Sequence, residues 1–328
     1  MSRISRRADA RRQPTRGEDP ADADGPHPLG DDGLAAPADE PTGAPTAGVP
    51  GDTTDGMAGA PHLVDPETGP VTGNSPPPPD DLVVDLRDVH KAFGPKKILK
   101  GVNLAVERGT SAVVLGGSGT GKSVLTKHVV GLLMPDKGEV WVLGERLDLM
   151  GQEQLDAKRT RLGYLFQGGA LFDSMTVYEN MRFYLDRLTT LTLEEKDDLI
   201  LESLEDVNLP ATRDQYPAEL SGGQKKRIGL ARTLILRPDI ILYDEPTTGL
   251  DPVSVRVVSE LIVKLRDTRG ISSIAITHDL LAAEIITDQA HFLLDGEIAA
   301  SGTLDEVRRS DVPELEEFFK GTDAYGHA

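Results

Sequence analysis

The chain has 328 residues, enough for one large domain or two small ones. It contains no cysteine, which excludes disulfides, thiolate metal sites and cysteine nucleophiles and is typical of a reducing compartment. The formal net charge of −19 disfavours binding to nucleic acid, because that binding needs a surface rich in lysine and arginine. The acidity agrees with solubility through self-repulsion or with adaptation to a salty cytoplasm.

The N-terminal part of the chain differs in composition from the rest. Residues 1–80 hold 26 prolines and glycines and end in consecutive prolines, so they have too little apolar surface to fold alone. We expect a disordered acidic tail there, either a solvated tail or a docking arm. The basic first residues lead into no apolar segment, so no secretory signal is expected, and no apolar run reaches the roughly 18 residues of a membrane span. A soluble, cytoplasmic domain over 81–321 and a short tail at 322–328 are therefore predicted.

Apolar runs and chain breakers predict the elements of this domain. In chain order they are strands at 82–86, 98–106 and 111–115, a helix at 124–133, strands at 140–143 and 161–166, helices at 193–207 and 225–236, a strand at 240–243, a helix at 255–269 and a strand at 272–277. Helices that alternate with buried strands predict an α/β domain with a largely parallel sheet. No internal repeat is visible, which indicates one such unit.

A glycine-rich loop lies between the predicted strand at 111–115 and the helix after it. It matches the pattern G-x-x-x-x-G-K-[ST] in the strand-loop-helix context that this pattern requires. Glycines let backbone N–H groups converge on phosphate oxygens, and the helix directs its positive end at the anion. Lys122 is expected to reach the β- and γ-phosphates, and Ser123 to hold Mg²⁺. The residues of the loop are Gly116, Gly117, Ser118, Gly119, Thr120, Gly121, Lys122 and Ser123.

Two acidic residues, Asp244 and Glu245, follow the apolar strand at 240–243. In open α/β sheets, ligands bind at the carboxyl ends of the strands. We therefore expect Asp244 to hold the Mg²⁺ shell and Glu245 to act as the general base toward the attacking water. An apolar run that ends in two acids is a common pattern, so this motif gains its weight from the phosphate loop upstream.

A second anion cradle is predicted at Leu220–Gln224, which reads LSGGQ just before a basic helix. A chain with two such phosphate-binding helix starts must either bind phosphate groups at two places or pair with a second copy of itself. On this motif the chain resembles the ABC ATPase family over residues ~82–320. Ser221, Gly222, Gly223 and Gln224 are then implied to bind nucleotide.

The other motifs of the family follow in order. Phe93 lies where the family stacks an aromatic ring on adenine, with core packing as the alternative reading. Gln167 matches the glutamine that senses Mg²⁺ and the γ-phosphate and links to the membrane partner. Asp251 matches the loop that crosses the dimer interface. His278 matches the histidine that contacts the γ-phosphate, so the resemblance implies Glu245, His278 and Gln167 as catalytic residues.

The resemblance implies a P-loop NTPase of the ABC ATPase fold. Its parts are a RecA-like core, an antiparallel β subdomain at ~82–110 and 138–147, and a helical subdomain near 168–225. It implies a homodimer around two Mg-ATP, with each ATP between Lys122 of one copy and Ser221–Gly223 of the other. Hydrolysis opens the dimer and drives a separate integral-membrane permease, which places the chain at the cytoplasmic face of the inner membrane.

The segment after Gln167 resembles one group in the family. Residues 166–180 read FQGGALFDSMTVYEN, and this text, with VPELEEFFKG at 312–321, resembles the ATPases of Mce-type (Mla) lipid transporters. That implies a Mce-domain partner and, in many systems, a STAS-domain partner. Leu171 and Phe172 either receive a coupling helix of the permease or pack within the helical subdomain. The tail 1–80 has no counterpart in the group.

Two other functions are open on this sequence. The core motifs only handle ATP, so they do not separate a lipid transporter from a small-solute importer. A non-transport ABC ATPase that acts on a membrane partner is the second alternative. Translation factors of the family carry two cassettes, and DNA-repair members carry coiled-coil insertions or cysteine-rich zinc modules, none of which this sequence has.

Overall fold

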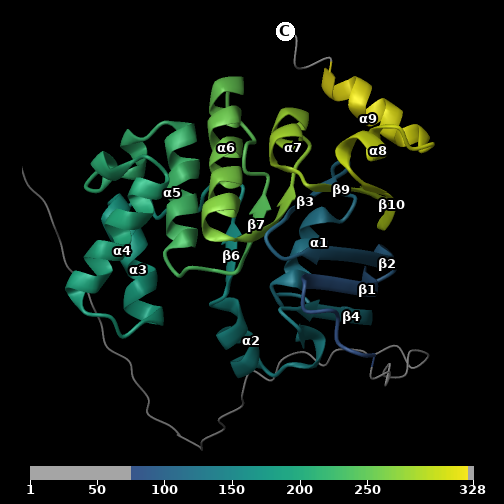
Figure 1. Cartoon of the computed structure of the whole chain (residues 1–328), viewed down its shortest axis with the longest axis horizontal. Helices are drawn as coiled ribbons and strands as arrows, with labels where there is room; N and C mark the ends of the chain where they lie inside the picture. Colours follow the sequence, from purple (N-terminus) through teal and green to yellow (C-terminus); the bar gives the residue numbers. More distant parts are fainter. Residues whose placement is uncertain (1–74, 324–328) are drawn as a thin grey trace, which may run out of the picture. The chain divides into compact units, whose positions relative to one another are not determined.

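The structure is a computed structural model that describes residues 75–323. The predicted tails, 1–80 and 322–328, lie outside this range except for residues 75–80 and 322–323. Within the described range the strands form two sheets, an antiparallel one and a mostly parallel one, with helices around the second (Figure 1).

The antiparallel sheet has the strand order β2-β1-β4-β5 within the described chain. Its strands are β1 (Leu82–Phe93), β2 (Lys96–Glu107), β4 (Lys137–Val142) and β5 (Glu145–Arg146). Leu86, Val102 and Val140 from three of its strands pack into one apolar cluster with helix α1 and one face of the parallel sheet. This sheet is therefore a layer over the core and not a separate domain.

The second sheet has the order β10-β9-β3-β8-β7-β6 within residues 75–323, and all neighbours are parallel except β10 with β9. The strands are β3 (Ser111–Leu115), β6 (Leu162–Leu165), β7 (Ile240–Asp244), β8 (Ser272–Ile276), β9 (Gln289–Leu294) and β10 (Glu297–Gly302). In β3, Val113 and Leu115 face one apolar cluster while Ala112 and Val114 face the other. Burial on both faces explains the continuous apolar runs and confirms the predicted α/β core.

Helices of the described chain lie around this sheet, and α3 and α4 pack on α5 beyond it (Figure 1). They are α1 (Lys122–Val129), α2 (Gln152–Arg159), α3 (Val177–Leu188), α4 (Leu193–Asp206), α5 (Gly222–Leu234), α6 (Pro252–Arg269), α7 (Leu280–Ile286), α8 (Leu304–Arg308) and α9 (Pro313–Asp323). Short 3₁₀ turns occupy Leu147–Leu149, Pro210–Thr212 and Pro217–Glu219. No helix in residues 75–323 is both long and apolar enough to cross a membrane.

The four predicted helices have different ends in the structure. The helix predicted at 255–269 is α6, which begins at Pro252, and the helix predicted at 193–207 is α4, which ends at Asp206. The helix predicted at 124–133 is α1, which begins at Lys122 and ends at Val129, because Gly131 takes a left-handed backbone with φ of 65°. The helix predicted at 225–236 is α5, which begins at Gly222, because the Ser221 side chain caps its first turn.

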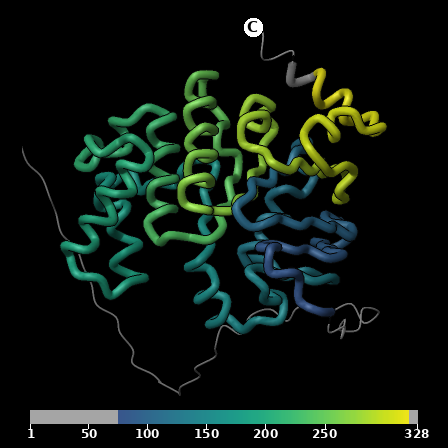
Figure 2. Tube along the Cα trace, in the orientation of Figure 1, coloured from purple at the N-terminus to yellow at the C-terminus, as the bar shows by residue number. Residues whose placement is uncertain are grey.

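The end of the described chain packs on the parallel sheet. Helices α8 and α9 run beside β9 and β10, as the yellow end of the tube in Figure 2 shows. Leu315 and Phe319 are buried, and the Phe318 ring lies 5.5 Å from the ring of Phe292 in β9. The segment at 312–321 is thus part of the folded unit.

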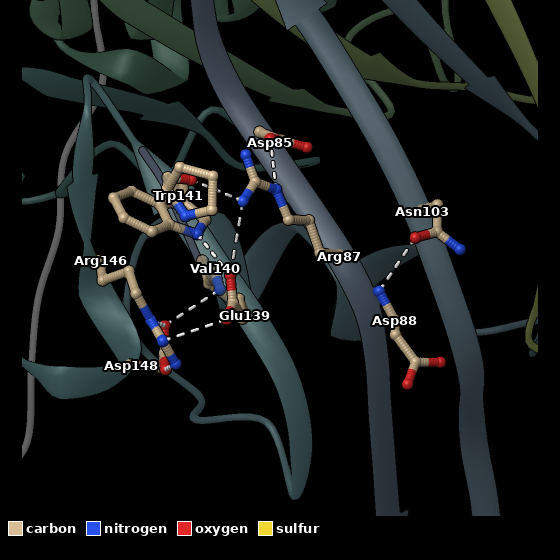
Figure 3. Close-up of polar contacts among 10 residues, drawn as sticks. Asp85, Arg87, Asp88, Asn103, Glu139, Val140, Trp141, Arg146 and Asp148 are labelled. Atoms are coloured by element: carbon tan, nitrogen blue, oxygen red, sulfur yellow. Dashed lines mark hydrogen bonds and ion pairs between the residues drawn. The ribbon is translucent and has the colours of Figure 1, made fainter. Parts of the chain in front are cut away.

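A cluster of charged side chains lies on the antiparallel sheet, on the face opposite its apolar cluster (Figure 3). Glu139 is 5% exposed, and its carboxylate accepts hydrogen bonds from Trp141 Nε1 at 2.8 Å and from Arg146 Nη1 at 3.2 Å. Arg87 lies 3.6 Å from the same carboxylate and donates to the carbonyl oxygen of Pro76. Cations therefore compensate the buried Glu139, and Arg87 fixes the start of the described chain against β1.

His291 in β9 predicts a pH-dependent stability. Its ring is 3% exposed, Nδ1 lies 2.9 Å from Ser301 Oγ, and burial lowers its pKa to about 4. An unfolded histidine titrates near 6.5, so the unfolded state binds the proton first as the pH falls. The stability that neutral His291 contributes is therefore full above pH ~6.5 and is lost toward pH ~4, by roughly 3 kcal/mol in total.

We expect His291→Asn to reduce the loss of unfolding free energy between pH 7.5 and pH 5.0 by about 2 kcal/mol, measured by urea unfolding at both pH values. Part of the loss will remain, because burial also lowers the pKa of His128. An unchanged difference between the two pH values would show that His291 does not titrate in this way.

Candidate functional site

Consecutive strands of the parallel sheet end at one edge, and each delivers a predicted site residue there (Figure 1). Lys122 follows β3, His278 follows β8, Asp244 closes β7, and Gln167 follows β6. Parallel strands point their carboxyl ends the same way, so residues far apart in the chain meet at this edge. The sheet order β3-β8-β7-β6 therefore assembles the site.

The phosphate loop turns sharply between β3 and α1. Gly116 has φ of 155° and Gly121 has φ of 109°, both left-handed values that other residues rarely adopt. A Cβ on Gly116 would collide with the carbonyl oxygen of Leu293, so the loop also passes close to β9. Gly117, Ser118 and Gly119 are exposed at the tip, where their backbone can approach a ligand.

Lys122 extends over this loop. Its Nζ donates to the carbonyl oxygens of Gly116 and Gly117, each at 2.8 Å. Burial lowers the pKa of Lys122, and the charges of Glu245 and Asp244 oppose that shift. The ammonium therefore lies near both carboxylates, in the position that a phosphate-binding lysine needs.

Asp244 is oriented by a residue that sequence reasoning missed. Tyr164 of β6 donates its hydroxyl to Asp244 Oδ2 at 2.9 Å and lies 3.3 Å from Thr126 Oγ1 of α1. Burial raises the pKa of Tyr164 to about 12, so the phenol keeps its proton and remains a donor. The strand pattern at 161–166 contained no sign of this contact, because it joins residues of different strands.

Glu245 and His278 are brought together as predicted. His278 Nδ1 lies 2.8 Å from Glu245 Oε2, and Thr248 Oγ1 donates to the same oxygen at 2.8 Å. The side chain of His278 is 56% exposed and that of Glu245 is 15% exposed, so the histidine lies on the solvent side of the pair. Glu245 has φ of 53°, a conformation that costs a non-glycine residue about 1–3 kcal/mol and clusters at functional sites.

Gln167 lies exposed two residues after the end of β6, next to the end of β7. Its carbonyl oxygen accepts a hydrogen bond from Lys226 Nζ, and the same ammonium donates to the carbonyl oxygen of Glu245 at 3.1 Å. Lys226 is 6% exposed and was not identified from the sequence, because a lysine in a basic helix carries no sign of burial.

The LSGGQ motif forms the start of α5. Ser221 Oγ accepts from Gln224 N at 3.3 Å, and Gln224 Oε1 accepts from Ser221 N at 2.8 Å, a reciprocal cap. Ser221 and Gly222 are exposed. Among the described residues no hydrogen bond or ion pair joins Ser221, Gly222 or Gly223 to the phosphate loop of the same chain.

Asp251 and Phe93 complete the set of predicted residues. Asp251 caps α6, accepting from Val253 N and Ser254 N at 3.0 Å, and its hydrogen bonds to Ser254 lower its pKa. A Cβ on Gly223 would lie 3.2 Å from Ser254 Oγ, so the Asp251 loop lies beside the LSGGQ motif. Phe93 is 50% exposed at the end of β1, which contradicts core packing, and the Lys91 ammonium lies 5.8 Å from the centroid of its ring.

Known proteins of one family are similar to this chain. The family model described as ABC transporter matches residues 99–248, and three relatives each match about three quarters of the chain. Protein TRIGALACTOSYLDIACYLGLYCEROL 3 of Arabidopsis thaliana is 38% identical, over 74% of this chain and 74% of its own. The probable ribonucleotide transport ATP-binding protein mkl of Mycobacterium leprae is 36% identical, over 74% of this chain and 70% of its own. The intermembrane phospholipid transport system ATP-binding protein MlaF of Escherichia coli is 35% identical, over 73% of this chain and 89% of its own.

The chain belongs to the ABC transporter ATP-binding family. A solved dimer of the ATP-binding cassette MJ0796, in a post-hydrolysis state with ADP and phosphate, is 30% identical to this ABC ATPase. It covers 67% of this chain and 98% of its own, with a TM-score of 0.62. The predicted ABC ATPase fold and ATP hydrolysis are confirmed, and cassettes of this family form dimers and work with membrane permeases.

The residues at the strand ends fit the ATP and Mg²⁺ that an ABC ATPase uses. The loop offers backbone N–H groups and the Lys122 ammonium to phosphate oxygens. Ser123, Asp244 and Gln167 offer a hydroxyl, a carboxylate and an amide oxygen, the ligand type that hard divalent cations bind. Tyr164 holds the Asp244 carboxylate in one orientation, which suits an acceptor that serves a metal.

Proposed function

We propose that this ABC ATPase hydrolyses ATP with Glu245 as general base. The contact between His278 and Glu245 is the observation that supports this assignment. Two donors on Oε2, His278 and Thr248, hold the Glu245 carboxylate in one rotation. A general base must lie in the correct position before its pKa becomes relevant. Among the described residues, Glu245 is the carboxylate at the carboxyl ends of the strands that both His278 and Thr248 contact.

In the proposed reaction, water attacks the γ-phosphorus of ATP and Glu245 takes its proton. The oxygen of water bonds to phosphorus as the bond to the bridging oxygen of ADP breaks, which yields ADP, phosphate and a proton. Lys122 and the loop N–H groups stabilise the charge on the phosphate oxygens. Ser123, Asp244 and Gln167 would hold Mg²⁺, which would neutralise charge on the β- and γ-phosphates.

We infer that two copies of the chain pair head to tail. Ser221 and Gly222 are exposed at the helix start and Gly223 is half-buried. Among the described residues these three have no hydrogen bond or ion pair to the phosphate loop of the same chain, which supports a role toward a second copy. Asp251 lies beside this motif and is assigned to the same interface. Gln224 supports the cradle through its cap on Ser221, and Phe93 is proposed to stack on adenine.

The proposed cargo is a phospholipid or another lipid. The names of MlaF and of the Arabidopsis relative refer to lipids, and MlaF matches over 89% of its length. The proposed partners are a permease, a Mce-domain protein and a STAS-domain protein, with the ATPase at the cytoplasmic face of the inner membrane. We assign the ATPase domain to 81–321 and its helical subdomain to 168–225, which includes α3 and α4.

Mass spectrometry tests the cargo on the full chain, purified from detergent-solubilised membranes of its own host. We expect a multi-span permease, a Mce-domain protein and bound phospholipid to co-purify. A permease that arrives with a periplasmic solute-binding protein would contradict lipid transport and leave the ATPase assignment intact.

A further inference from the structure

Lys226 is a buried cation that joins the two chain segments carrying the proposed catalytic groups. Its ammonium donates to the carbonyl oxygens of Gln167 and Glu245, which lie 59 and 19 residues away in the chain. A buried charge persists only when other groups compensate it, and here carbonyl dipoles and the nearby carboxylates of Asp244 and Glu245 do so. Lys226 therefore contacts the main chain under the site and not the side chains that face it.

The contact at Glu245 falls where the backbone needs support. A non-glycine residue keeps a left-handed backbone only where its surroundings hold it there. The Glu245 N–H donates to the carbonyl oxygen of Ile276 at 2.9 Å, and its own carbonyl oxygen accepts from Lys226. These two bonds fix both ends of the residue, and with them the direction of its side chain.

Helix α5 also forms hydrogen bonds to the loop after Gln167. Arg232 is 7% exposed and donates to the carbonyl oxygens of Gly169 at 2.9 Å and Ala170 at 2.7 Å. Between the two cations lies Gly229, where a Cβ would come within 3.0 Å of both the Gly169 carbonyl oxygen and Leu165. The face Lys226–Gly229–Arg232 thus packs directly on this loop, and Lys226 extends the contact to Glu245.

We propose that Lys226 is a positioning residue that ties the LSGGQ helix, the Gln167 loop and Glu245 into one unit. The inference rests on the proposed roles of Gln167 and Glu245. The LSGGQ motif forms the start of α5, and Lys226 lies on the same helix. A movement of the motif would therefore move Lys226 and, through its hydrogen bond, the main chain of Glu245. Removing Lys226 should misalign Glu245 without affecting the phosphate loop, which holds ATP independently.

The test compares Lys226→Met, Lys226→Gln and Lys226→Arg in the full chain, with Lys225→Met as the matched control. Lys225 is the neighbouring, half-buried lysine of the same helix. We expect Lys226→Met to lower kcat about tenfold or more, as the loss of a charged hydrogen bond predicts, with KM and the affinity for a fluorescent ATP analogue within about twofold. Lys226→Arg, which retains a donor to both carbonyls, should recover most of kcat, and Lys225→Met should resemble the parent.

A parental kcat in Lys226→Met would overturn the proposal. So would a loss of kcat that Lys226→Arg does not recover and that a lower melting temperature accompanies, because that pattern indicates a purely structural lysine. If Lys226→Met does not fold, the proposal requires kcat of Lys226→Gln to lie below that of Lys226→Arg. Glu245→Gln, assayed in parallel, separates the two hypotheses: an active Glu245→Gln disproves the base, whereas an inactive Glu245→Gln beside a fully active Lys226→Met disproves only the role of Lys226.

Discussion

Glu245→Gln is expected to lower kcat for ATP hydrolysis about 100- to 10,000-fold, the contribution typical of a positioned general base. The amide keeps the size of the carboxylate and an oxygen that accepts from Thr248, so the local fold should persist. Glutamine does not take a proton from water, so the loss should fall on the chemical step. ATP affinity should stay close to that of the parent, because Lys122 and the loop are unchanged.

The measurement is steady-state phosphate release together with the binding of a fluorescent ATP analogue. Glu260→Gln is the matched control, since Glu260 lies on the outer part of α6 with a side chain 60% exposed and only a weak contact to Arg256 at 4.0 Å. Hydrolysis by Glu245→Gln at the parental rate would disprove the base assignment, whatever the control does.

Lys122→Ala is expected to reduce strongly the stabilisation that Mg-ATP gives the protein. A ligand that binds only the folded state raises its stability by an amount set by concentration over Kd. Loss of a charged donor to phosphate costs roughly 1.5–3 kcal/mol, which is about a 10- to 100-fold weaker affinity. The variant also loses the two hydrogen bonds of Lys122 Nζ to the carbonyl oxygens of Gly116 and Gly117, so the thermal shift is measured against the melting temperature of the same variant without nucleotide.

Thermal melting with and without Mg-ATP checks this prediction. Lys127→Ala is the control, because Lys127 is an exposed lysine in the last turn of the same helix. An undiminished thermal shift in Lys122→Ala would show that this lysine does not bind the phosphates. The two variants also separate binding from chemistry, since Glu245→Gln should keep the thermal shift that Lys122→Ala reduces.

Local motifs made most of the site predictable. The run from 111 to 123 contains a strand, its glycine turn and a helix start in one short segment, and β3 has the predicted bounds. Helix ends were harder, because Gly131 and the Ser221 cap act through backbone angles and side-chain bonds. Helix α7 and strands β9 and β10 were not predicted at all, since they are short and their packing comes from distant parts of the chain.

The sequence by itself determined that the protein binds and hydrolyses ATP, because the phosphate loop and the LSGGQ motif are each formed by residues that lie close together in the chain. The tertiary structure alone decided how those groups are held. Tyr164 reaches Asp244 across 80 residues, and Lys226 reaches Gln167 across 59, through the parallel order of the strands and the packing of α5. Such contacts depend on burial and on the relative placement of whole elements, and a residue pattern along one segment carries no information on either.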